Sequence, residues 1–505
     1  MKNFRSILIL LIVSINICAQ DSISVIHRLQ NNLSPVTNFS AGFSHNPAST
    51  VYTMQASMSD LSIGYEKQTG EGTLVQIGSE FESYAFRAES YAKIKNNHIW
   101  GKASYVNRNI DNIAWNESSD YLNIYPYVMA DSVQSNNLRS EKYSFTGGYV
   151  QNPGRISWGI QLDYWALLEY RTKDPRPDNN TSNLVFTGGL NYKLNAAYAI
   201  GGGVLLRKYK QKNSLTFSDV VGEPMIYHLT GLGTDAYFFA NGYPSVLYNG
   251  NGYGANIQLL SVQKQGISSE FAFENFSFDK TLNGNNSQKI EISTVDEDKY
   301  NFSISYLKKI NGQDIGVKIS SSYTDREGEE NKFTQEGNNL IKITSETEYR
   351  NKTAIADMSF LYRNNSTNTT WSLIPYVSYL NMKETYKSLE RSMQISRLAF
   401  GIKPAFTQPV KKHLLHLNAD IGYSQNIDSS LELPGISRDR DNMASVPQRD
   451  YDLLSSNYLL ANISSRFDNL LSKKNITIYL QLDWSYKNYD NIYSNLFKIS
   501  TGVFF

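Results

Sequence analysis

Cysteine is almost absent from this chain of 505 residues, because Cys18 is its only one. A single cysteine excludes an intramolecular disulfide and a zinc site built from several thiolates. Long apolar runs are also rare, since only residues 7–17 form one and they fall short of the ~20 residues of a transmembrane helix. Neither sign of charge is in excess, with 48 basic side chains against 47 acidic ones. The composition therefore excludes a helical membrane bundle and gives no indication of nucleic-acid binding.

Catalytic and metal-binding motifs are also missing from the sequence. We find no Gly-x-Ser-x-Gly turn, no His-Glu-x-x-His pair, and no Gly-Lys-Ser/Thr after the glycines of residues 200–206. Among the six histidines, His413 and His416 come closest to a ligand pair, but three positions along a predicted strand place them on opposite faces. We therefore expect no catalytic residues, no metal and no cofactor, and we expect that the protein is not an enzyme.

The N-terminus has the pattern of a secretory signal peptide. A basic start at Lys2 and Arg5 is followed by an apolar stretch that is too short to cross a bilayer, and then by "CAQD". We expect a signal peptide over residues 1–19, so that the mature chain begins at Gln20. A lipidated Cys18 is the alternative, but a bulky isoleucine precedes it where lipoprotein signals carry a small residue.

The stretch "RISWGIQLDYWALLEYR" (155–171) alternates in polarity over its whole length. Its even-numbered positions from Ile156 to Tyr170 are all apolar or aromatic, whereas most odd-numbered positions are polar or small. A period of two is typical of a β-strand with a different environment on each face. With a tilt of ~45° such a strand rises ~40 Å, enough to cross the ~25 Å apolar band of an outer-membrane barrel. We predict that the even-numbered residues face lipid and the odd-numbered ones face a wet lumen, with a long strand of a soluble β-sandwich or β-helix as the alternative.

The end of the chain carries a second indication of a barrel. In "LFKISTGVFF" (496–505) a polar residue at Lys498, an apolar residue at Val503 and a terminal Phe505 resemble the assembly signal of bacterial outer-membrane barrels. The departure from that signal is Ser500, where glycine is usual. The resemblance implies that outer-membrane lipid surrounds the protein and that the barrel assembly machinery recognises its last strand. The 35 tyrosines suit the aromatic girdles of such barrels.

Short and long connections alternate along the rest of the chain. Glycine, proline and asparagine mark tight turns such as 151–154 and 310–312. Outer-membrane barrels have short periplasmic turns and longer external loops. We therefore predict an all-β fold, a transmembrane antiparallel outer-membrane β-barrel over residues 58–505, with about 18 strands and a range of about 16–20. The long polar stretches, which we expect to be extracellular loops, are 110–141, 171–183, 211–250, 279–298, 325–350, 384–393 and 426–455.

Residues 20–57 precede the first predicted strand and are too irregular to form one. We expect them to be a periplasmic segment or to fold into the lumen as a small hatch. Asn46, Pro47 and Ala48 resemble the "NPA" of the N-terminal hatch in FadL-type channels for hydrophobic compounds. An ordinary turn before the first strand is the alternative.

Two polar stretches carry distinctive motifs, "EYRTKDPRPDNNTSNL" (169–184) and "AWNESSDYLNIYPYVMAD" (114–131). Their pattern resembles an uncharacterised family of outer-membrane β-barrels of the Bacteroidetes. The resemblance implies a location in the cell outer membrane of a Gram-negative bacterium, and it implies no mechanism. From the matching positions we select six candidate binding residues in extracellular loops: Trp115, Asp120, Asp131, Arg171, Asp174 and Arg176. The alternative is a stiff loop, in which prolines fix the backbone beside an Asp174–Arg176 pair.

These features favour a non-enzymatic barrel for solute passage, or an accessory to an energised, TonB-type uptake system. Its partners would then include a TonB-dependent transporter or a surface lipoprotein, and no nucleic acid. A surface-binding or adhesive barrel with a closed lumen is the main alternative, because long loops on a rigid scaffold are suited to recognition. A FadL-like channel for hydrophobic compounds and a barrel enzyme such as a lipase are the remaining hypotheses.

Overall fold

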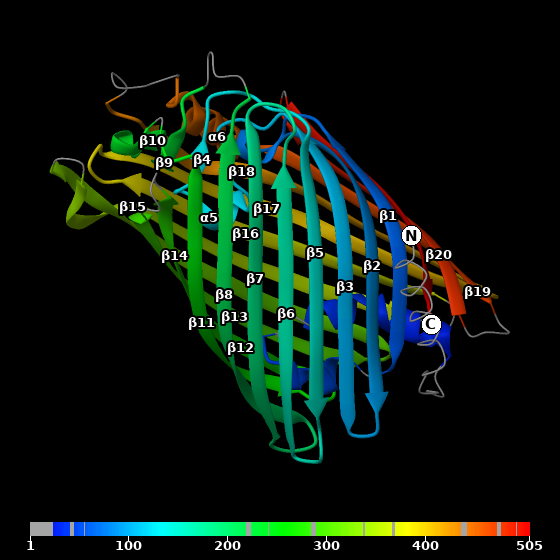
Figure 1. Cartoon of the computed structure of the whole chain (residues 1–505). Helices are drawn as coiled ribbons and strands as arrows, with labels where there is room; N and C mark the ends of the chain where they lie inside the picture. The colour runs from blue at the N-terminus through cyan, green and yellow to red at the C-terminus, as the bar shows by residue number, and fades with distance from the viewer. Residues whose placement is uncertain are drawn as a thin grey trace, which may run out of the picture.

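The computed structural model describes residues 24–40, 45–54, 56–218, 224–240, 242–283, 289–336, 339–365, 369–435, 442–471, 476–490 and 492–505. Within these residues, eighteen strands form one antiparallel sheet, which closes because β1 pairs with β21 (Figure 1). The predicted fold class, an antiparallel barrel of the outer-membrane type with about 18 strands, is confirmed. The expected signal peptide, residues 1–19, lies outside the described residues. In the described part of the chain, no helix is long and apolar enough to cross a membrane.

The barrel strands follow one another around the wall in chain order. A closed sheet leaves no unpaired edge, which is required where a bilayer offers no hydrogen-bond partners. The strands are β1 (Met58–Thr69), β2 (Glu80–Ile94), β3 (Asn97–Asp111), β5 (Leu138–Gln151), β6 (Ile156–Tyr170), β7 (Arg176–Lys193), β8 (Tyr198–Thr216), β11 (Ser245–Ser261), β12 (Gly266–Asn283), β13 (Lys289–Ile310), β14 (Gln313–Glu336), β15 (Asn339–Asn365), β16 (Thr370–Tyr386), β17 (Arg391–Val410), β18 (His413–Glu432), β19 (Tyr458–Leu471), β20 (Ile476–Tyr489) and β21 (Ile492–Phe504).

The two rims of the barrel differ in the length of their connections. One rim carries tight turns such as 152–155 and 311–312, close to the turns predicted from the sequence. The opposite rim carries longer connections such as 70–79 and 112–137. Because periplasmic turns are short in such barrels, we take the first rim as periplasmic and the second as the outer rim.

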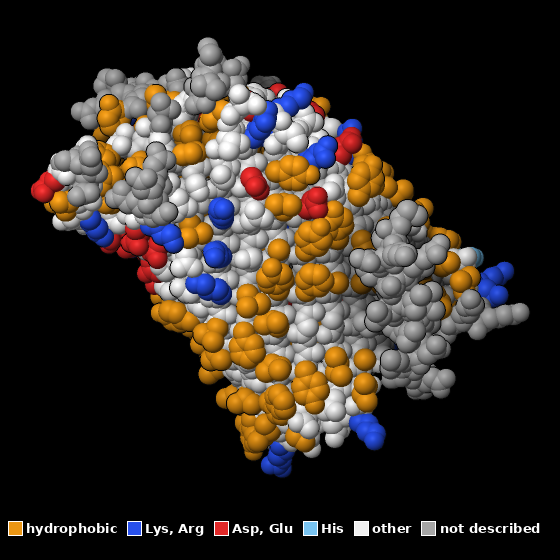
Figure 2. Space-filling view, viewed as in Figure 1, with side chains coloured by type: hydrophobic (Ala, Val, Ile, Leu, Met, Phe, Trp, Pro, Cys, Tyr) orange, Lys and Arg blue, Asp and Glu red, His pale blue; other side chains and the backbone are white. Residues whose placement is uncertain are grey.

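Strand β6 shows the predicted division of its faces. Ile160 and Leu162 point outward and are 43% and 47% exposed. Gln161 lies between them on the luminal face, where it accepts a hydrogen bond from Trp100 Nε1 at 3.2 Å. The same outward apolar positions recur on neighbouring strands and form the belt seen in Figure 2. The prediction that even-numbered residues of β6 face lipid is confirmed.

A row of aromatic side chains marks the upper edge of this belt on four adjacent strands. Ring centroids are 6.1 Å apart between Tyr253 and Phe273, 5.2 Å between Phe273 and Tyr300, and 6.3 Å between Tyr300 and Tyr323. Aromatic rings of this kind prefer the interface between lipid and water. On the side of β11 to β14, the row therefore marks the level at which the membrane ends toward the outer rim.

Three polar stretches that we predicted to be long loops are largely strands, which corrects the sequence prediction. In 171–183, β7 already begins at Arg176, so this residue is not in a loop. In 279–298 and 325–350, strands β12 to β15 continue well beyond the aromatic row. Above the membrane the outer face of a strand contacts water instead of lipid, so these segments lack the apolar outer face that reveals a strand in lipid.

The N-terminal segment lies in the lumen near the periplasmic rim (Figure 1). Val25 and Leu29, four positions apart on one helix face, pack against Leu414 and Phe504 of the wall. The Ser24 side chain accepts a hydrogen bond from the backbone of His27 and so caps this helix. We call residues 24–40 and 45–54 the inner plug. Its elements are α2 (Val25–Asn32), α3 (Pro35–Ser40), η1 (Pro47–Ser49) and α4 (Thr50–Thr53).

Two wall glycines make room for the turn at Asn46. Its Oδ1 atom accepts from the backbone N of Ala48 at 2.9 Å, and its Nδ2 atom donates to the carbonyl of Leu190 at 3.0 Å. A Cβ atom on Gly159 would lie 3.0 Å from the backbone N of Ala48, and one on Gly189 would lie 2.0 Å from Asn46 Oδ1. The Asn-Pro-Ala stretch is therefore a capped turn fitted against the luminal wall.

Several loops of the outer rim fold inward and enter the outer half of the barrel (Figure 1). Strand β9 is buried along its whole length and pairs with both β4 and β10 in a small separate sheet. We call residues 112–137, 224–240 and 442–457 the outer lid. Its elements are α5 (Tyr121–Ile124), β4 (Met129–Ala130), β9 (Tyr227–Gly231), β10 (Thr234–Asp235), η3 (Tyr237–Phe239) and α6 (Ser445–Ser455).

Candidate functional site

The outer lid has its own apolar core, which packs against the luminal face of β8 and β11 to β13. Within it, the rings of Trp115 and Tyr227 lie 5.6 Å apart, and Tyr248 Oη donates to the carbonyl of Tyr127 at 2.7 Å. Apolar burial of this kind stabilises the inward position of the lid by excluding water from both surfaces. Buried members of this core include Ile124, Val128, Met129, Tyr209, Ile226, Val246, Phe276, Phe278 and Ile292.

A buried ion pair fastens the lid to the connection between β6 and β7. The Nη2 atom of Arg171 pairs with the Glu117 carboxylate, and the two side chains are only 3% and 2% exposed. Arg171 Nε also donates to the carbonyl of Pro175 at 3.1 Å, and Asn179 Nδ2 donates to the carbonyl of Glu117 at 2.9 Å. Asp131 lies near enough for the charge of Arg171 to lower its pKa, although burial has the larger, opposite effect. Arg171 is thus part of a buried anchor, and Asp131 is buried in the same lid without an ion pair to it, with a hydrogen bond from the backbone N of Val133 at 2.8 Å.

Trp115 and Asp120 are likewise buried inside the lid. Tyr209 Oη donates to Asp120 Oδ2 at 3.1 Å, and burial raises the pKa of Asp120. Trp115 contributes to the apolar core and is 8% exposed. Both residues lie in the stretch 110–141, which we predicted to be an extracellular loop. This connection is present, but it folds into the lumen.

Asp174 and Arg176 are partly exposed, at the outer rim. Asp174 Oδ1 and Arg176 Nε are 2.7 Å apart, and the side chains are 29% and 40% exposed. The second carboxylate oxygen of Asp174 accepts from the backbone N of Ser218 at 2.8 Å. This exposed pair joins the β6–β7 connection to the end of β8. A binding role for the six candidate residues stays a prediction.

Several partners of the lid gave no signal in the sequence. Glu117 is inside the second motif but was not selected, and its partner Arg171 is in the first. Lys280 on β12 is completely buried and donates to the carbonyl of Val128 at 3.1 Å. Glu384 on β16 accepts a hydrogen bond from Tyr125. Single polar residues on a strand do not reveal which loop will cover them, so only the fold could identify these contacts.

Between the inner plug and the outer lid, charged side chains face the lumen and remain exposed. Lys102 and Glu89 form an ion pair at 2.8 Å with 49% and 35% exposure, although both lie on the luminal face. On the far wall, Lys403 is 48% exposed and lies 3.7 Å from Asp420. Exposure of this degree inside a barrel requires open space around the side chains. We call this charged region of the lumen the chamber.

A small cavity of about 200 Å³ opens from the lumen at the edge of the inner plug. It is bordered by His45 of the plug and by Glu270, Ser303, Lys318 and Asp357 of the wall. His45 Nδ1 lies 3.2 Å from Glu270 Oε1, and the hydrogen bond to this carboxylate raises the pKa of His45. The chamber therefore offers groups of both charges, which suits a polar solute better than an apolar one. Among the residues described, no three His, Cys, Asp or Glu side chains are placed to share a metal ion.

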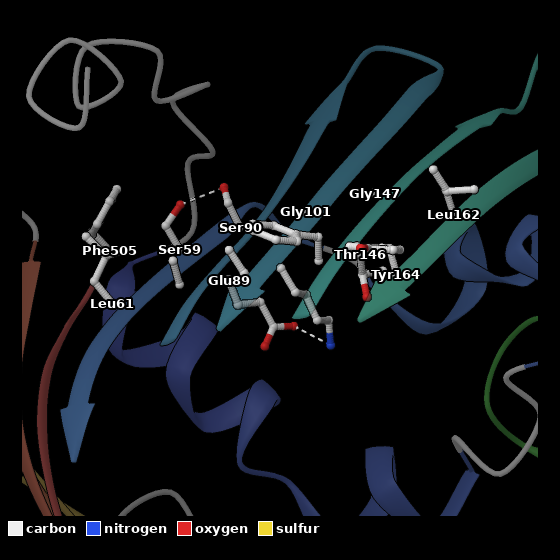
Figure 3. Close-up of a pocket in the computed structure, with 14 residues that line it drawn as sticks. Ser59, Leu61, Glu89, Ser90, Gly101, Thr146, Gly147, Leu162, Tyr164 and Phe505 are labelled. Carbon is white, nitrogen blue, oxygen red and sulfur yellow. Dashed lines mark hydrogen bonds and ion pairs between the residues drawn. The ribbon is translucent and has the colours of Figure 1, made fainter. Parts of the chain in front are cut away.

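A larger depression of about 530 Å³ lies on the lipid-facing side of β1 to β6 (Figure 3). Small residues such as Ser90, Gly101 and Gly147 form its floor, and Leu162 is part of its wall. The side chain of Glu89 points to the opposite side of the sheet, toward the helices of the inner plug. This depression faces the bilayer, so we do not count it as part of the chamber.

Closure of the outer lid is expected to weaken as the pH rises from about 4 to about 7. Burial raises the pKa of Asp450 to about 7, opposed in part by Gln76, whose Nε2 donates to its carboxylate at 2.8 Å. Burial also raises the pKa of Asp131 to about 6. Since both groups bind protons more tightly in the closed lid, each stabilises closure at low pH and loses that contribution as the pH rises through its raised pKa.

Hydrogen exchange of residues 112–137, corrected for intrinsic rates, measures this effect. Each group contributes at most about 1.4 kcal/mol per pH unit between its two pKa values. Asp450→Asn should flatten the pH dependence, whereas Asp452→Asn on the exposed side of the same helix should leave it unchanged. The same slope in wild type and Asp450→Asn would contradict the prediction.

Several solved structures are similar to this chain at low sequence identity. The outer membrane transporter YddB from Escherichia coli is 8% identical, with 88% of this chain and 81% of that chain covered and a TM-score of 0.40. BauA, the ferric preacinetobactin receptor from Acinetobacter baumannii, is 8% identical, with 88% and 80% covered and a TM-score of 0.39. The ferric yersiniabactin uptake receptor FyuA from Yersinia pestis is 8% identical, with 89% and 80% covered and a TM-score of 0.37.

No curated protein sequence matches this chain. One family profile does match, and its match extends over residues 47–505, from the turn of the inner plug to the last strand. The match therefore includes the whole barrel wall, the outer lid and both motifs that the sequence singled out. The chain belongs to this family, which is described as "Family of unknown function (DUF6850)".

Proposed function

We propose that the protein is a non-enzymatic, gated passage for a small polar solute across the outer membrane. The observation that carries this proposal is the chamber, where exposed charged groups such as Lys102 and Lys403 face open space inside the barrel. A barrel that served only as a scaffold would need no such exposed charges within its wall. The pairing of lysines with carboxylates offers both signs of charge to a solute in transit.

Passage requires that the plug and the lid move, because they occupy the two ends of the lumen. The inner plug is held by small apolar clusters, such as Val25 and Leu29 against Leu414 and Phe504, and by polar contacts, such as that of Arg363 Nη1 with Ser34 Oγ at 2.5 Å. The lid, in contrast, is held by a large apolar core and a buried ion pair. Polar contacts exchange readily with water, so we place the energised step at the plug. A TonB-type system in a Gram-negative member of the Bacteroidetes, with a transporter or surface lipoprotein as partner, would supply this step.

A second function, surface binding by a closed barrel, is favoured by the packing of the lid. Its core contains residues from three outer connections and from four wall strands, which is more than a simple gate requires. In that case the rim, including the exposed Asp174–Arg176 pair, would bind a partner while the lumen stays shut. Ion conductance distinguishes the two functions.

The test is conductance in planar bilayers of the full-length protein and of three variants. One variant replaces lid residues 114–133 with a short Gly-Ser linker, the second carries His45→Ala with Asn46→Ala in the plug, and the third combines both changes. We expect little current from wild type and open-channel current from the combined variant. His27→Ala is the matched control, because His27 is exposed on the same plug and its side chain has no described contact with the wall.

A combined variant that folds but carries no current would favour the closed binding barrel. Heat-modifiable migration on a gel shows whether the barrel has folded. If the lid variant does not fold, Lys403→Cys in the otherwise intact chain gives a second measurement. A small thiol reagent should label this chamber position faster in energised cells than in de-energised ones, and equal rates would contradict energised opening.

A further inference from the structure

One strand of the barrel carries three exposed lysines in a row on its outer face. Lys208, Lys210 and Lys212 occupy alternate positions of β8, on the same face as Val204 and Leu206, which are 57% and 59% exposed. Residues two apart on a strand are roughly 7 Å apart, so the row spans about 13 Å. Figure 2 shows the basic column directly above the apolar belt on the face that carries β8.

The neighbours of these lysines on the outer face are neutral. In the register of the sheet, Lys208, Lys210 and Lys212 lie beside the following residues of β7 and β11: Leu184, Ser182, Asn180, Asn251, Asn249 and Leu247. Lys208 Nζ donates to Asn249 Oδ1 at 2.8 Å and to Asn251 Oδ1 at 2.9 Å. In the described part of the chain, no carboxylate lies within 4.0 Å of any of the three ammonium groups. The row is therefore a local excess of positive charge without an ion pair, and Asp178, which lies diagonally beside Lys212, is a single negative charge at its upper end.

The opposite face of the same strand is fixed in the core of the lid. Tyr209 and Gln211 alternate with the lysines, and both are fully buried. Gln211 Nε2 donates to the carbonyl of Ser119 at 2.9 Å. A rigid backbone holds the three lysines at fixed spacing, so only their side chains lose freedom on binding.

On the outer face of β13 and β14 the charge has the other sign. Asp296, Asp298, Asp325 and Glu327 lie on the outer face of β13 and β14, above Tyr300 and Tyr323. Some of this charge is paired, as in the contact of Arg350 with Asp325 at 2.6 Å. On β15 and β16, Lys352 lies beside Lys383 in the register of the sheet, but Lys352 has a carboxylate, Asp325, at 3.9 Å. The row on β8 differs because its three lysines have no such partner among the described residues.

We propose that this row binds the phosphate groups of the phosphorylated glycolipid in the outer leaflet. Its position immediately above the belt is the depth at which lipid phosphates lie, and lysine ammonium groups donate charge-assisted hydrogen bonds to phosphate oxygens. The acyl chains of the same lipid would lie on Val204 and Leu206 directly below. This combination of charge and apolar surface selects a phosphorylated lipid over free phosphate.

The test uses the full-length protein in detergent micelles and lipid A as the probe, with retention measured by native mass spectrometry. Replacing Lys208, Lys210 and Lys212 with glutamine should weaken lipid A retention roughly a hundredfold, because each lysine at a charged lipid surface contributes on the order of fivefold. The matched control replaces Lys308, Lys309 and Lys411, which are exposed beside the periplasmic turns, and should retain lipid A as wild type does. Heat-modifiable migration checks that every variant is folded.

Two further probes identify the bound chemistry. Dephosphorylated lipid A should bind poorly, and inorganic phosphate at the same concentration should not displace lipid A. Equal retention of lipid A by wild type and the β8 variant, or equal binding of the dephosphorylated lipid, would overturn the proposal. Loss of self-association in the β8 variant with unchanged lipid A retention would also overturn it, since the row would then contact the acidic face of a second copy.

Discussion

Replacing Arg171 with alanine is expected to release the outer lid and to lower its stability by about 3–5 kcal/mol. The reason is that the substitution leaves the Glu117 carboxyl without its partner in a site where it is only 2% exposed and where burial raises its pKa to about 8, so the group must stay charged without a partner or take up a proton. It also removes the hydrogen bond from Arg171 Nε to the carbonyl of Pro175. Hydrogen exchange and limited proteolysis of residues 112–137 measure lid opening, while urea unfolding in lipid vesicles measures the barrel.

Arg176→Ala is the matched control for this prediction. Arg176 is in the same motif, but its ion pair with Asp174 is 40% and 29% exposed, so its loss should cost at most about 1 kcal/mol. The double replacement Glu117→Gln with Arg171→Met should restore much of the lid protection, since no charge then stays buried without a partner. If Arg171→Ala and Arg176→Ala open the lid equally, the buried pair is not its anchor.

Arginine at position 162 is expected to destabilise the barrel by roughly 2–4 kcal/mol, whereas arginine at position 161 should be tolerated within about 1 kcal/mol. Leu162 points into lipid midway along the outward row of β6 and is 47% exposed. Gln161 faces the lumen, where its Nε2 donates to Asp163 Oδ2 at 2.6 Å. An arginine at 161 would therefore meet water and a carboxylate, and one at 162 would meet acyl chains.

Unfolding titrations of both variants in vesicles of one lipid composition provide the comparison. Folding efficiency, followed by heat-modifiable migration, is the second readout in case Leu162→Arg does not insert. Similar losses at the two positions would show that the faces of β6 have been assigned wrongly. A large loss at Gln161→Arg alone would have the same meaning.

The barrel itself could be predicted because a bilayer acts on each strand locally. In β6 the alternation from Ile156 to Tyr170 records which side chains meet lipid, and the observed exposure follows it from Ile156 to Tyr164. The short turns, such as 311–312, were recognisable because tight reversals need particular residues. None of these signals depends on residues far away in the chain.

The interior of the barrel could be predicted only in part. Of the six candidate residues, Arg171 forms a buried ion pair, but its partner Glu117 was not selected. The burial of Asp120 depends on Tyr209, which lies on a strand that gives no indication of what it faces. Long polar strands such as β14 were mistaken for loops, because above the membrane their outer face meets water and carries no apolar row.

The sequence by itself thus determined the wall: alternating strands, their approximate number, and the difference between the two rims. The tertiary structure alone decided that residues 112–137 fold inward, that Arg171 anchors them, and that charged groups such as Lys403 remain exposed in a chamber. The physical reason is that the two kinds of interaction act over different distances along the chain. Lipid and water impose a period of two on each strand separately, whereas a lid is held by contacts between segments that meet only when the sheet has closed.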